Sequence, residues 1–383
     1  MNLKYVIALI LILLSLVGVI VYEYKYIKRV LILTGRKVEK RSVKVAIGIV
    51  AAVIFVLSVM SSIMLMFLLH FVILAMLTDF IRFVYMKVRK DKSDKKFSKV
   101  FSVVYGFGVI PLVITCAIII YGYFNMMNVV RTNYTLNTDK KFNIEEDGEY
   151  RVALIADVHY GISLDDEKMK LICDEISGCN PDIVVLCGDI VDENSTKEEM
   201  EYVFSALGKI KSKYGVFYVY GNHDRQLYNP NKAYTLDEIE NAIKQNGITI
   251  LQDEAILLND EFVVFGREDA GYNKDKGRTP VAEILADVDS SVYKLGLDHQ
   301  PKDYDENAEA EVDLLLSGHT HGGQIWPANY LFEIVKFDDA VYGLIDDGQN
   351  NFSAIVTSGL AGWGYTIKTA SPAEYVIIDI KGR

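Results

Sequence analysis

The sequence predicts two different parts: an α-helical transmembrane region of about four helices, followed by an α/β domain built around a sheet. The first observation is charge, because the net charge of −11 divides into +13 over residues 1–131 and −24 over residues 132–383. The second is that three long apolar blocks lie before residue 125, and the third is that short β-branched runs alternate with amphipathic stretches after Tyr150. A basic apolar half joined to an acidic polar half is typical of a membrane anchor with a soluble domain.

The expected organisation is a transmembrane anchor over residues 1–130, a polar linker over 131–149 and a folded domain over 150–383. The acidic balance of the folded domain argues against nucleic acid as its partner. The four cysteines, none of them in a CxxC pair, predict neither a disulfide framework nor a cysteine-based zinc site.

The three apolar blocks predict four membrane spans, at about residues 3–22, 45–62, 63–85 and 100–124. A helix needs about 20 residues to cross ~30 Å of hydrocarbon, so the first and third blocks fit one crossing each. The second block is long enough for two crossings, with a tight turn at Ser58–Ser62. A cleaved signal peptide is the alternative for the first block, but it lacks the small-residue cleavage pattern.

Two basic segments test this division of the apolar blocks. Residues 23–44 and residues 82–99 each carry eight Lys or Arg residues, and short basic loops prefer the cytoplasm. Both loops can be cytoplasmic only if an even number of helices separates them. The sequence therefore predicts a multi-pass protein of the cell membrane, with its N-terminus and its folded domain outside the cytoplasm.

The folded domain opens with five elements in βαβαβ order, which predicts an α/β domain. These are a strand at 151–156, a helix at 165–177, a strand at 183–187, a helix at 197–210 and a strand at 216–220. Further strands are expected at 262–265, 292–297 and 312–316. Three late strands without clear helices between them, 341–345, 353–357 and 375–380, predict a second and more antiparallel sheet.

Histidine, aspartate and asparagine gather directly after the apolar strands. The chain has six histidines, and five of them follow strands: His159, His223, His299, His319 and His321. The carboxyl ends of strands are where α/β sheets build their sites. Imidazole together with carboxylate suits manganese, iron or zinc better than magnesium or calcium. Two such ions sharing a carboxylate can clamp the attacking and leaving oxygens of a phosphoryl displacement.

The motifs follow one another in a definite order. They are D-x-H from Asp157, G-D-x-x-D from Gly188, G-N-H-D from Gly221, a lone His299 and G-H-x-H from Gly318. Over about residues 150–383 this series resembles the calcineurin-like metallophosphoesterases. The G-H-T-H-G-G-Q stretch and the multi-span anchor resemble the membrane-anchored bacterial phosphodiesterase branch of that family. The resemblance implies a four-layer αββα sandwich.

The resemblance also implies a role for each site residue. Asp157, His159 and His321 would bind a first divalent metal ion, Asn222, His299 and His319 a second, and Asp189 would bridge them. His223 would be a general acid that binds no metal, oriented by Asp224. The nucleophile would be a metal-bridging hydroxide. Trp363, in the glycine-rich stretch 359–364, is expected in a loop near the site.

The expected function is that of a membrane-anchored, metal-dependent phosphoesterase, which hydrolyses a phosphodiester, phosphomonoester or pyrophosphate bond. A lipid-linked phosphate ester is one expected substrate. Glu193-Asn194 stands where the phosphoprotein phosphatase branch has Arg-Gly, which disfavours that branch. One alternative is a non-catalytic metal-binding scaffold or sensor on the same fold, which predicts a missing ligand or acid, and none is missing. The other is a transporter with a regulatory domain, which few intramembrane charges and no visible repeat disfavour.

Overall fold

The computed structural model describes residues 3–88, 103–142, 149–272, 277–346 and 351–383. The chain divides into two compact units, Met1–Tyr123 and Phe124–Arg383. The first unit is helical, and the second contains all the β-strands that the structure describes.

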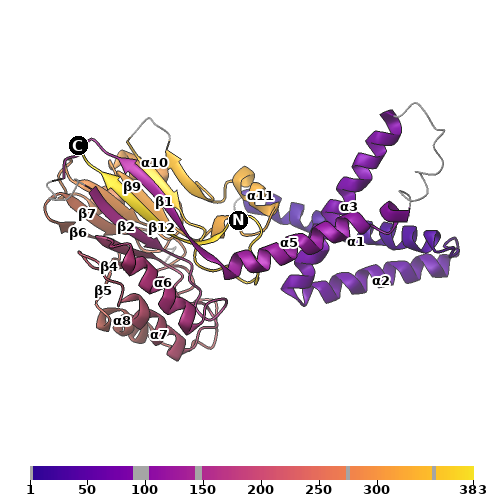
Figure 1. The fold of residues 1–383 in the computed structure, drawn as a ribbon, viewed down its shortest axis with the longest axis horizontal. Helices are drawn as coiled ribbons and strands as arrows, with labels where there is room; N and C mark the ends of the chain where they lie inside the picture. The colour runs from indigo at the N-terminus through magenta and orange to yellow at the C-terminus, as the bar shows by residue number, and fades with distance from the viewer. Residues whose placement is uncertain (1–2, 89–102, 143–148, 273–276, 347–350) are drawn as a thin grey trace. The chain divides into compact units, whose positions relative to one another are not determined.

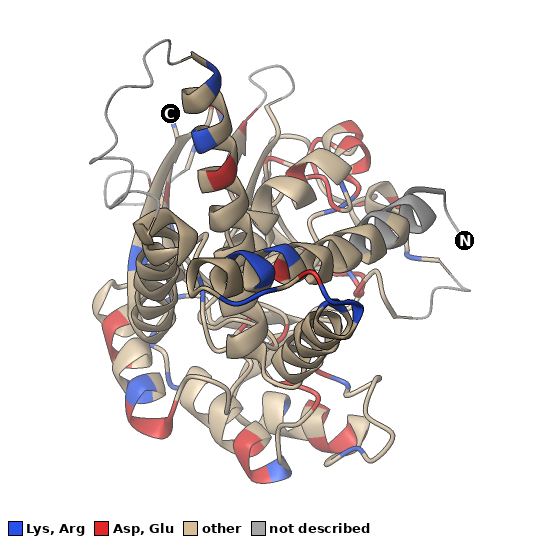
Figure 2. Ribbon diagram, turned by 90° about the vertical axis from the view of Figure 1, so that its right-hand side faces the viewer, with Lys and Arg blue, Asp and Glu red and all other residues tan. Residues whose placement is uncertain are grey.

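The helical unit consists of long apolar helices: α1 (Leu3–Leu33), α2 (Arg41–Val59), α3 (Ser62–Val88) and most of α5 (Val109–Met127). Among the described residues, α2, α3 and α5 are long and apolar enough to cross a membrane. Figure 2, with Lys and Arg in blue and Asp and Glu in red, shows the long uncharged stretches of such helices. The turn between α2 and α3 lies at Met60 and Ser61, inside the segment where the sequence predicts it.

Two helix boundaries differ from the predicted bounds of the membrane spans. Helix α1 continues to Leu33, so residues 23–33 of the first basic segment are helical and do not form a loop. Helix α5 begins at Val109 and not at residue 100, because a turn at Phe107–Gly108 precedes it and Gly108 has a φ of 60°. A left-handed glycine interrupts a helix at little steric cost. Residues 89–99 of the second basic segment lie outside the described residues.

The second unit contains two six-stranded sheets (Figure 1). The first has the order β1 (Val129–Asn137), β12 (Ala373–Lys381), β2 (Glu149–Ile155), β3 (Ile183–Cys187), β4 (Val216–Val219), β5 (Ile248–Ile250). The second has the order β10 (Gly343–Asp346), β11 (Ser353–Val356), β9 (Leu314–Ser317), β8 (Tyr293–Leu297), β7 (Phe262–Gly266), β6 (Glu254–Leu258). Antiparallel pairs lie at both edges of the second sheet, with parallel pairs between them.

Three apolar cores hold four layers together. One core lies between the first sheet and helices α6 (Asp166–Gly178), α7 (Lys197–Leu207) and α8 (Leu236–Gln245). The second lies between the two sheets and joins β2, β3 and β12 to β7, β8 and β9. The third packs the second sheet against α9 (Val281–Ile284) and α10 (Tyr304–Glu309). This is the αββα sandwich that the resemblance implies.

Two predictions about the sheets are wrong. Residues 129–137 form strand β1 and not the start of a linker: this strand pairs in parallel with β12 at the edge of the first sheet, and its alternate residues are partly buried. Strand β12 belongs to the first sheet and not to the second, because it pairs antiparallel with β2 on its other side. Conversely, the predicted strands at 262–265, 292–297 and 312–316 build the centre of the second sheet.

Candidate metal centre

The seven predicted ligands follow the carboxyl ends of five strands, and five of them have a backbone conformation that few residue types adopt. Positive φ angles occur at Asp157 (49°), His159 (38°), Asp189 (51°), His319 (72°) and His321 (51°). Such angles are uncommon for residues other than glycine, and they cluster at functional sites, where surrounding structure holds them. Here the strand ends turn abruptly, and polar side chains from different strand ends come close to one another.

Hydrogen bonds and close packing hold these turns in place. The N–H of Asp157 donates to the carbonyl of Gly188 (3.0 Å), and the N–H of His159 donates to the carbonyl of Asp189 (3.0 Å). Gly188 has a φ of 78°, and a Cβ atom there would stand 2.7 Å from Nδ1 of His299. Only glycine therefore lets the loop after β3 approach the histidine after β8 so closely.

The side chains form two adjacent groups of possible metal ligands. One group is Asp157, His159 and His321, and the other is Asp189, His299 and His319; within each group the ligand atoms lie within 4.8 Å of one another. The Oδ1 of Asn222 lies 3.2 Å from Nε2 of His299, and so belongs with the second group. The structure thus brings together all seven residues that the sequence assigns to metal binding.

Asp189 lies between the two groups. Its Oδ2 is 3.1 Å from Nε2 of His299 in the second group and 3.8 Å from Nε2 of His159 in the first. Burial alone would raise the pKa of Asp189, but the facing imidazoles outweigh burial and hold this pKa below its usual value. An ionised carboxylate at this position can serve both groups at once.

The imidazole rings are held with one nitrogen turned into the centre. Nδ1 of His159 lies 3.1 Å from Oδ2 of Asp192, Nδ1 of His321 lies 3.1 Å from the carbonyl of Ala361, and Nδ1 of His299 lies 2.8 Å from the carbonyl of Cys187. A protonated Nδ1 that donates to such an acceptor leaves Nε2 as a lone pair. These partners therefore fix the tautomer that binds a metal.

The donor atoms fit divalent cations. With their Nδ1 atoms turned outward, the Nε2 atoms of His159 and His321 face each other at 3.3 Å, where a divalent cation could accept both lone pairs in place of a shared proton. Burial lowers the pKa of His319 to about 3, which favours its neutral, metal-binding form. Burial also raises the pKa of Asp157 to about 6, and a bound cation would offset that penalty.

The predicted partner of His223 is wrong. Nδ1 of His223 lies 3.2 Å from Oε1 of Glu193, on the loop after β3. Asp224 instead accepts four backbone N–H groups, from Asp189 (2.9 Å), Ile190 (2.8 Å), Val191 (3.2 Å) and Gly221 (2.6 Å). A buried carboxylate that binds four N–H groups holds the loops after β3 and β4 together. Asp224 thus positions Asp189, and Glu193 is the residue that orients His223.

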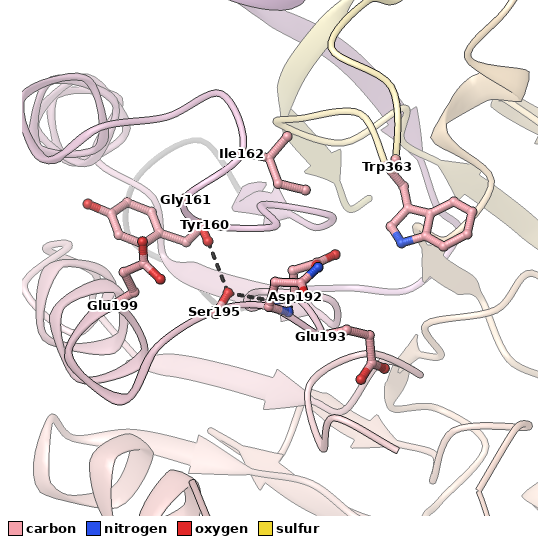
Figure 3. A pocket seen from close by; sticks show the side chains of 10 residues that line it. Tyr160, Gly161, Ile162, Asp192, Glu193, Ser195, Glu199 and Trp363 are labelled. Atoms are coloured by element: carbon pink, nitrogen blue, oxygen red, sulfur yellow. Dashed lines mark hydrogen bonds between the residues drawn. The ribbon is translucent and has the colours of Figure 1, made fainter. Parts of the chain in front are cut away.

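An open pocket of about 390 Å³ is drawn in Figure 3. It is lined by Tyr160, Gly161, Ile162, Asp192, Glu193, Asn194, Ser195, Glu199, Trp363 and Gly364. One of its lining residues is Asp192, which also contacts Nδ1 of the ligand His159. The indole of Trp363 is half exposed, and its centre lies 5.3 Å from the imidazole of His223. The sequence places Trp363 near the site, but it gives no signal for Glu193 beyond its place in the motif after Asp192.

Lys368 is fully buried behind the first group of ligands. Its Nζ donates to the carbonyl of Ser358 and lies 3.4 Å from the carbonyl of Ala361, which also faces His321. Burial lowers the pKa of this ammonium to about 7. Lys368 therefore supports the loop behind His321 and is not exposed toward the pocket.

Comparison with known proteins agrees with this geometry. Residues 150–323 match the family described as Calcineurin-like phosphoesterase. Uncharacterized metallophosphoesterase Cj0846 of Campylobacter jejuni is 28% identical over 293 residues, which is 76% of this chain and 74% of that protein. A metallophosphoesterase of Aquifex aeolicus is 29% identical over 252 residues, 65% of this chain and 91% of that protein. A "Transmembrane protein with metallophosphoesterase domain" of Danio rerio is 24% identical over 299 residues, 71% and 62% of the two chains.

The two sheets, the paired ligand groups and these matches define a metal-dependent phosphoesterase. The chain carries a calcineurin-like metallophosphoesterase domain, and it is a hydrolase that acts on phosphate esters. The apolar helices and the transmembrane relative indicate association with a membrane.

Proposed function

We propose that this protein is a membrane-anchored phosphoesterase with two divalent metal ions, which hydrolyses a phosphodiester, phosphomonoester or pyrophosphate bond. The observation that carries the proposal is Asp189, whose Oδ2 lies within 3.8 Å of a histidine Nε2 from each ligand group. Mixed imidazole and carboxylate donors favour manganese, iron or zinc. When bound, the two ions would activate water and neutralise phosphoryl oxygens.

The ligand roles follow from the two groups. Asp157, His159 and His321 hold the first ion, and Asn222, His299 and His319 hold the second, with Asp189 between them. Asp192 fixes the ring of His159 through Nδ1. Buried partners of this kind typically change metal affinity by about 10- to 100-fold.

His223 supplies the proton to the leaving oxygen. Its ring centre lies 5.5 Å from that of His159, so it borders the centre without belonging to either ligand group. Glu193 holds Nδ1, which leaves Nε2 to carry the transferable proton. Trp363 and the pocket beside His223 provide room for the leaving group.

The apolar helices support a location of this chemistry at the cell membrane. We assign a multi-pass anchor, with the catalytic unit outside the cytoplasm, from the apolar helices and the basic segments 23–44 and 82–99. Such a location favours a phosphate ester that is lipid-linked or close to the bilayer. The acidic catalytic unit disfavours nucleic acid as a substrate or partner.

The test uses the full chain, purified in lipid nanodiscs and stripped of metal with a chelator. Manganese, iron or zinc is added back, and bound metal is measured with hydrolysis of 4-nitrophenyl phosphate, bis(4-nitrophenyl) phosphate and pyrophosphate. We expect two ions per chain and hydrolysis of at least one substrate. Bound metal without hydrolysis of any of them would favour the non-catalytic scaffold.

A variant separates the acid from the ligands. His223→Ala should keep both ions while lowering kcat by about 10²–10⁴, the usual contribution of a positioned general acid. His319→Ala is the matched comparison, because it should lose metal from the second group. Loss of metal in His223→Ala would reassign that histidine as a ligand.

A further inference from the structure

Helix α11 (Ala328–Val335) is an apolar helix that buries none of its residues. Its exposed side chains include Tyr330, Leu331, Phe332 and Ile334, and Ile334 is 78% exposed. A helix in a folded domain ordinarily buries one apolar stripe against a core. Contiguous exposed apolar residues mark a surface that meets another apolar phase.

The start of α11 is connected to the end of the spanning helix α5. The carbonyl of Gln324 accepts N–H groups from Thr369 (2.8 Å) and Ala370 (3.1 Å), and the N–H of Trp326 donates to Oγ1 of Thr369 (2.8 Å). The same loop binds Asn125 in the last turn of α5.

Asn125 makes two hydrogen bonds to that loop. Its Nδ2 donates to the carbonyls of Lys368 (2.9 Å) and Ser371 (2.7 Å). Asn125 and this loop both belong to the unit Phe124–Arg383. The last turn of a candidate membrane span is therefore two hydrogen-bonded steps from Trp326, and α11 begins two residues after Trp326.

We propose that α11 inserts its apolar side chains into the surface of the bilayer that α5 crosses; this rests on the membrane anchoring given under Proposed function. The carboxyl end of a spanning helix lies at the membrane surface, and the loop 368–371 fixes the start of α11 beside that end. Tyr330 and Trp326 are residue types enriched at the interface. Leu331, Phe332 and Ile334 are the types that interfacial helices bury among acyl chains.

This placement brings the metal centre to the membrane. Helix α11 begins seven residues after the ligand His321, and it packs against the turn η1 (His321–Gly323). On this proposal the occupant of the α11 surface is a lipid bilayer, and the metal centre acts on phosphate esters carried by lipids. A second copy of this chain is the other occupant to be tested.

The first experiment places a fluorophore on α11 in the full chain. Ile334→Cys is labelled with the environment-sensitive dye NBD, after Cys116→Ser and Cys179→Ser remove the accessible thiols. The matched control is Leu257→Cys on β6, because Leu257 is another exposed apolar side chain of the same unit, at 50% exposure. The protein is placed in phosphatidylcholine–phosphatidylglycerol vesicles that contain nitroxide-labelled lipid.

We expect nitroxide lipid to quench the label at position 334 and to leave the label at position 257 unchanged. Equal quenching by nitroxide lipid at the two positions would overturn the proposal. Energy transfer between labelled copies at 334, without quenching by lipid, would also overturn it and assign the surface to a second copy.

The second experiment measures activity in the same vesicles. Leu331→Glu/Ile334→Glu should leave hydrolysis of soluble 4-nitrophenyl phosphate within about twofold of wild type, as for other surface changes. Hydrolysis of vesicle-borne phosphatidic acid should fall about tenfold or more, because each side chain loses its apolar burial. Leu171→Glu/Leu257→Glu is the control, with two exposed leucines elsewhere in the unit.

The outcomes distinguish this inference from the proposed function. If the wild-type chain hydrolyses phosphatidic acid, two results for Leu331→Glu/Ile334→Glu would overturn the role of α11. One is an equal loss of activity on both substrates, and the other is no loss of activity on phosphatidic acid. A wild-type chain that hydrolyses neither of these phosphomonoesters, nor bis(4-nitrophenyl) phosphate, nor pyrophosphate would overturn the proposed function, while lipid quenching at position 334 would still decide the place of α11.

Discussion

Replacement of Glu193 by glutamine tests whether Glu193, and not Asp224, orients the imidazole of His223. Oε1 of Glu193 lies 3.2 Å from Nδ1 of His223, and both side chains are nearly buried, at 14% and 11% exposure. Glutamine keeps the size and an acceptor oxygen but removes the charge. The change therefore isolates the stabilisation of a protonated imidazole by a carboxylate.

The expected loss follows from the strength of that contact. Hydrogen bonds to a charged group contribute about 1.5–3 kcal/mol, and each 1.4 kcal/mol corresponds to about a tenfold change in rate. Glu193→Gln should thus lower kcat by about 10- to 100-fold, less than removal of His223 itself. The KM for a small substrate should change little, because Glu193 acts through the imidazole.

The assay compares leaving groups. We expect a larger loss of kcat with phenyl phosphate than with 4-nitrophenyl phosphate, since 4-nitrophenolate departs with little protonation. Glu199→Gln is the matched control, because Glu199 lines the same pocket but caps α7 and does not contact His223. Metal content, measured by mass spectrometry, should equal that of wild type.

Three results would refute this reasoning. They are a loss of bound metal in Glu193→Gln, an equal loss of kcat for both leaving groups, and an equal effect of Glu199→Gln. Each would show that the 193 side chain supports the loop and does not act on the imidazole of His223.

The remaining predictions concern the metal bridge, the loops and the anchor. Asp189→Ala should lose both ions, whereas Asp192→Ala should lower the affinity for the first ion by about 10- to 100-fold. Full metal content in Asp189→Ala would contradict the bridging role of Asp189. Asp224→Asn should lower the free energy of unfolding by about 1–3 kcal/mol, because backbone donors near Asp189 lose a buried partner; an unchanged thermal melt would be inconsistent with that role. Burial holds the pKa of Lys368 at about 7 against an ordinary 10.5, so the unfolded chain binds this proton more readily than the folded chain does. The cost of burying the charged ammonium therefore lowers the free energy of unfolding in full below pH 7, and this cost vanishes as pH approaches 10.5. Melts of Lys368→Met should then show their largest gain over wild type below pH 7, and a pH-independent difference would exclude this cause. Protease added to intact cells should remove the catalytic unit, and a fully protected unit would exclude the proposed orientation.

The strands and ligands that the sequence predicts share one property. Each strand from β2 to β9 that carries a ligand is a short, mostly buried and apolar run, and Asp, Asn or His follows within three residues of its end. That contrast between an apolar run and a polar end is local, so the printed sequence is enough to find it. The carboxyl ends of parallel neighbours then meet at one edge of a sheet, which brings the ligands together.

Long-range strand pairing explains why two features of the sheets are predicted wrongly from the sequence. Strand β1 is polar, and it becomes a strand because residues 129–137 pair with residues 373–381 at the far end of the chain. Strand β12 is apolar enough to be found, but its sequence does not say which sheet it joins. Register and partner choice depend on tertiary packing, and β-propensity follows that packing more than it determines it.

The same limit explains why the sequence predicts Asp224, and not Glu193, as the residue that orients His223. Asp224 stands next to His223 in the chain, so adjacency suggests that its carboxylate orients the imidazole. Yet consecutive side chains on a turn leave in different directions, and that of Asp224 meets backbone N–H groups of the loop after β3, including those of Asp189 and Ile190. The carboxylate that reaches the imidazole comes from Glu193, thirty residues earlier in the chain. A motif therefore identifies residue types that gather at a site, while the assignment of each contact requires the fold.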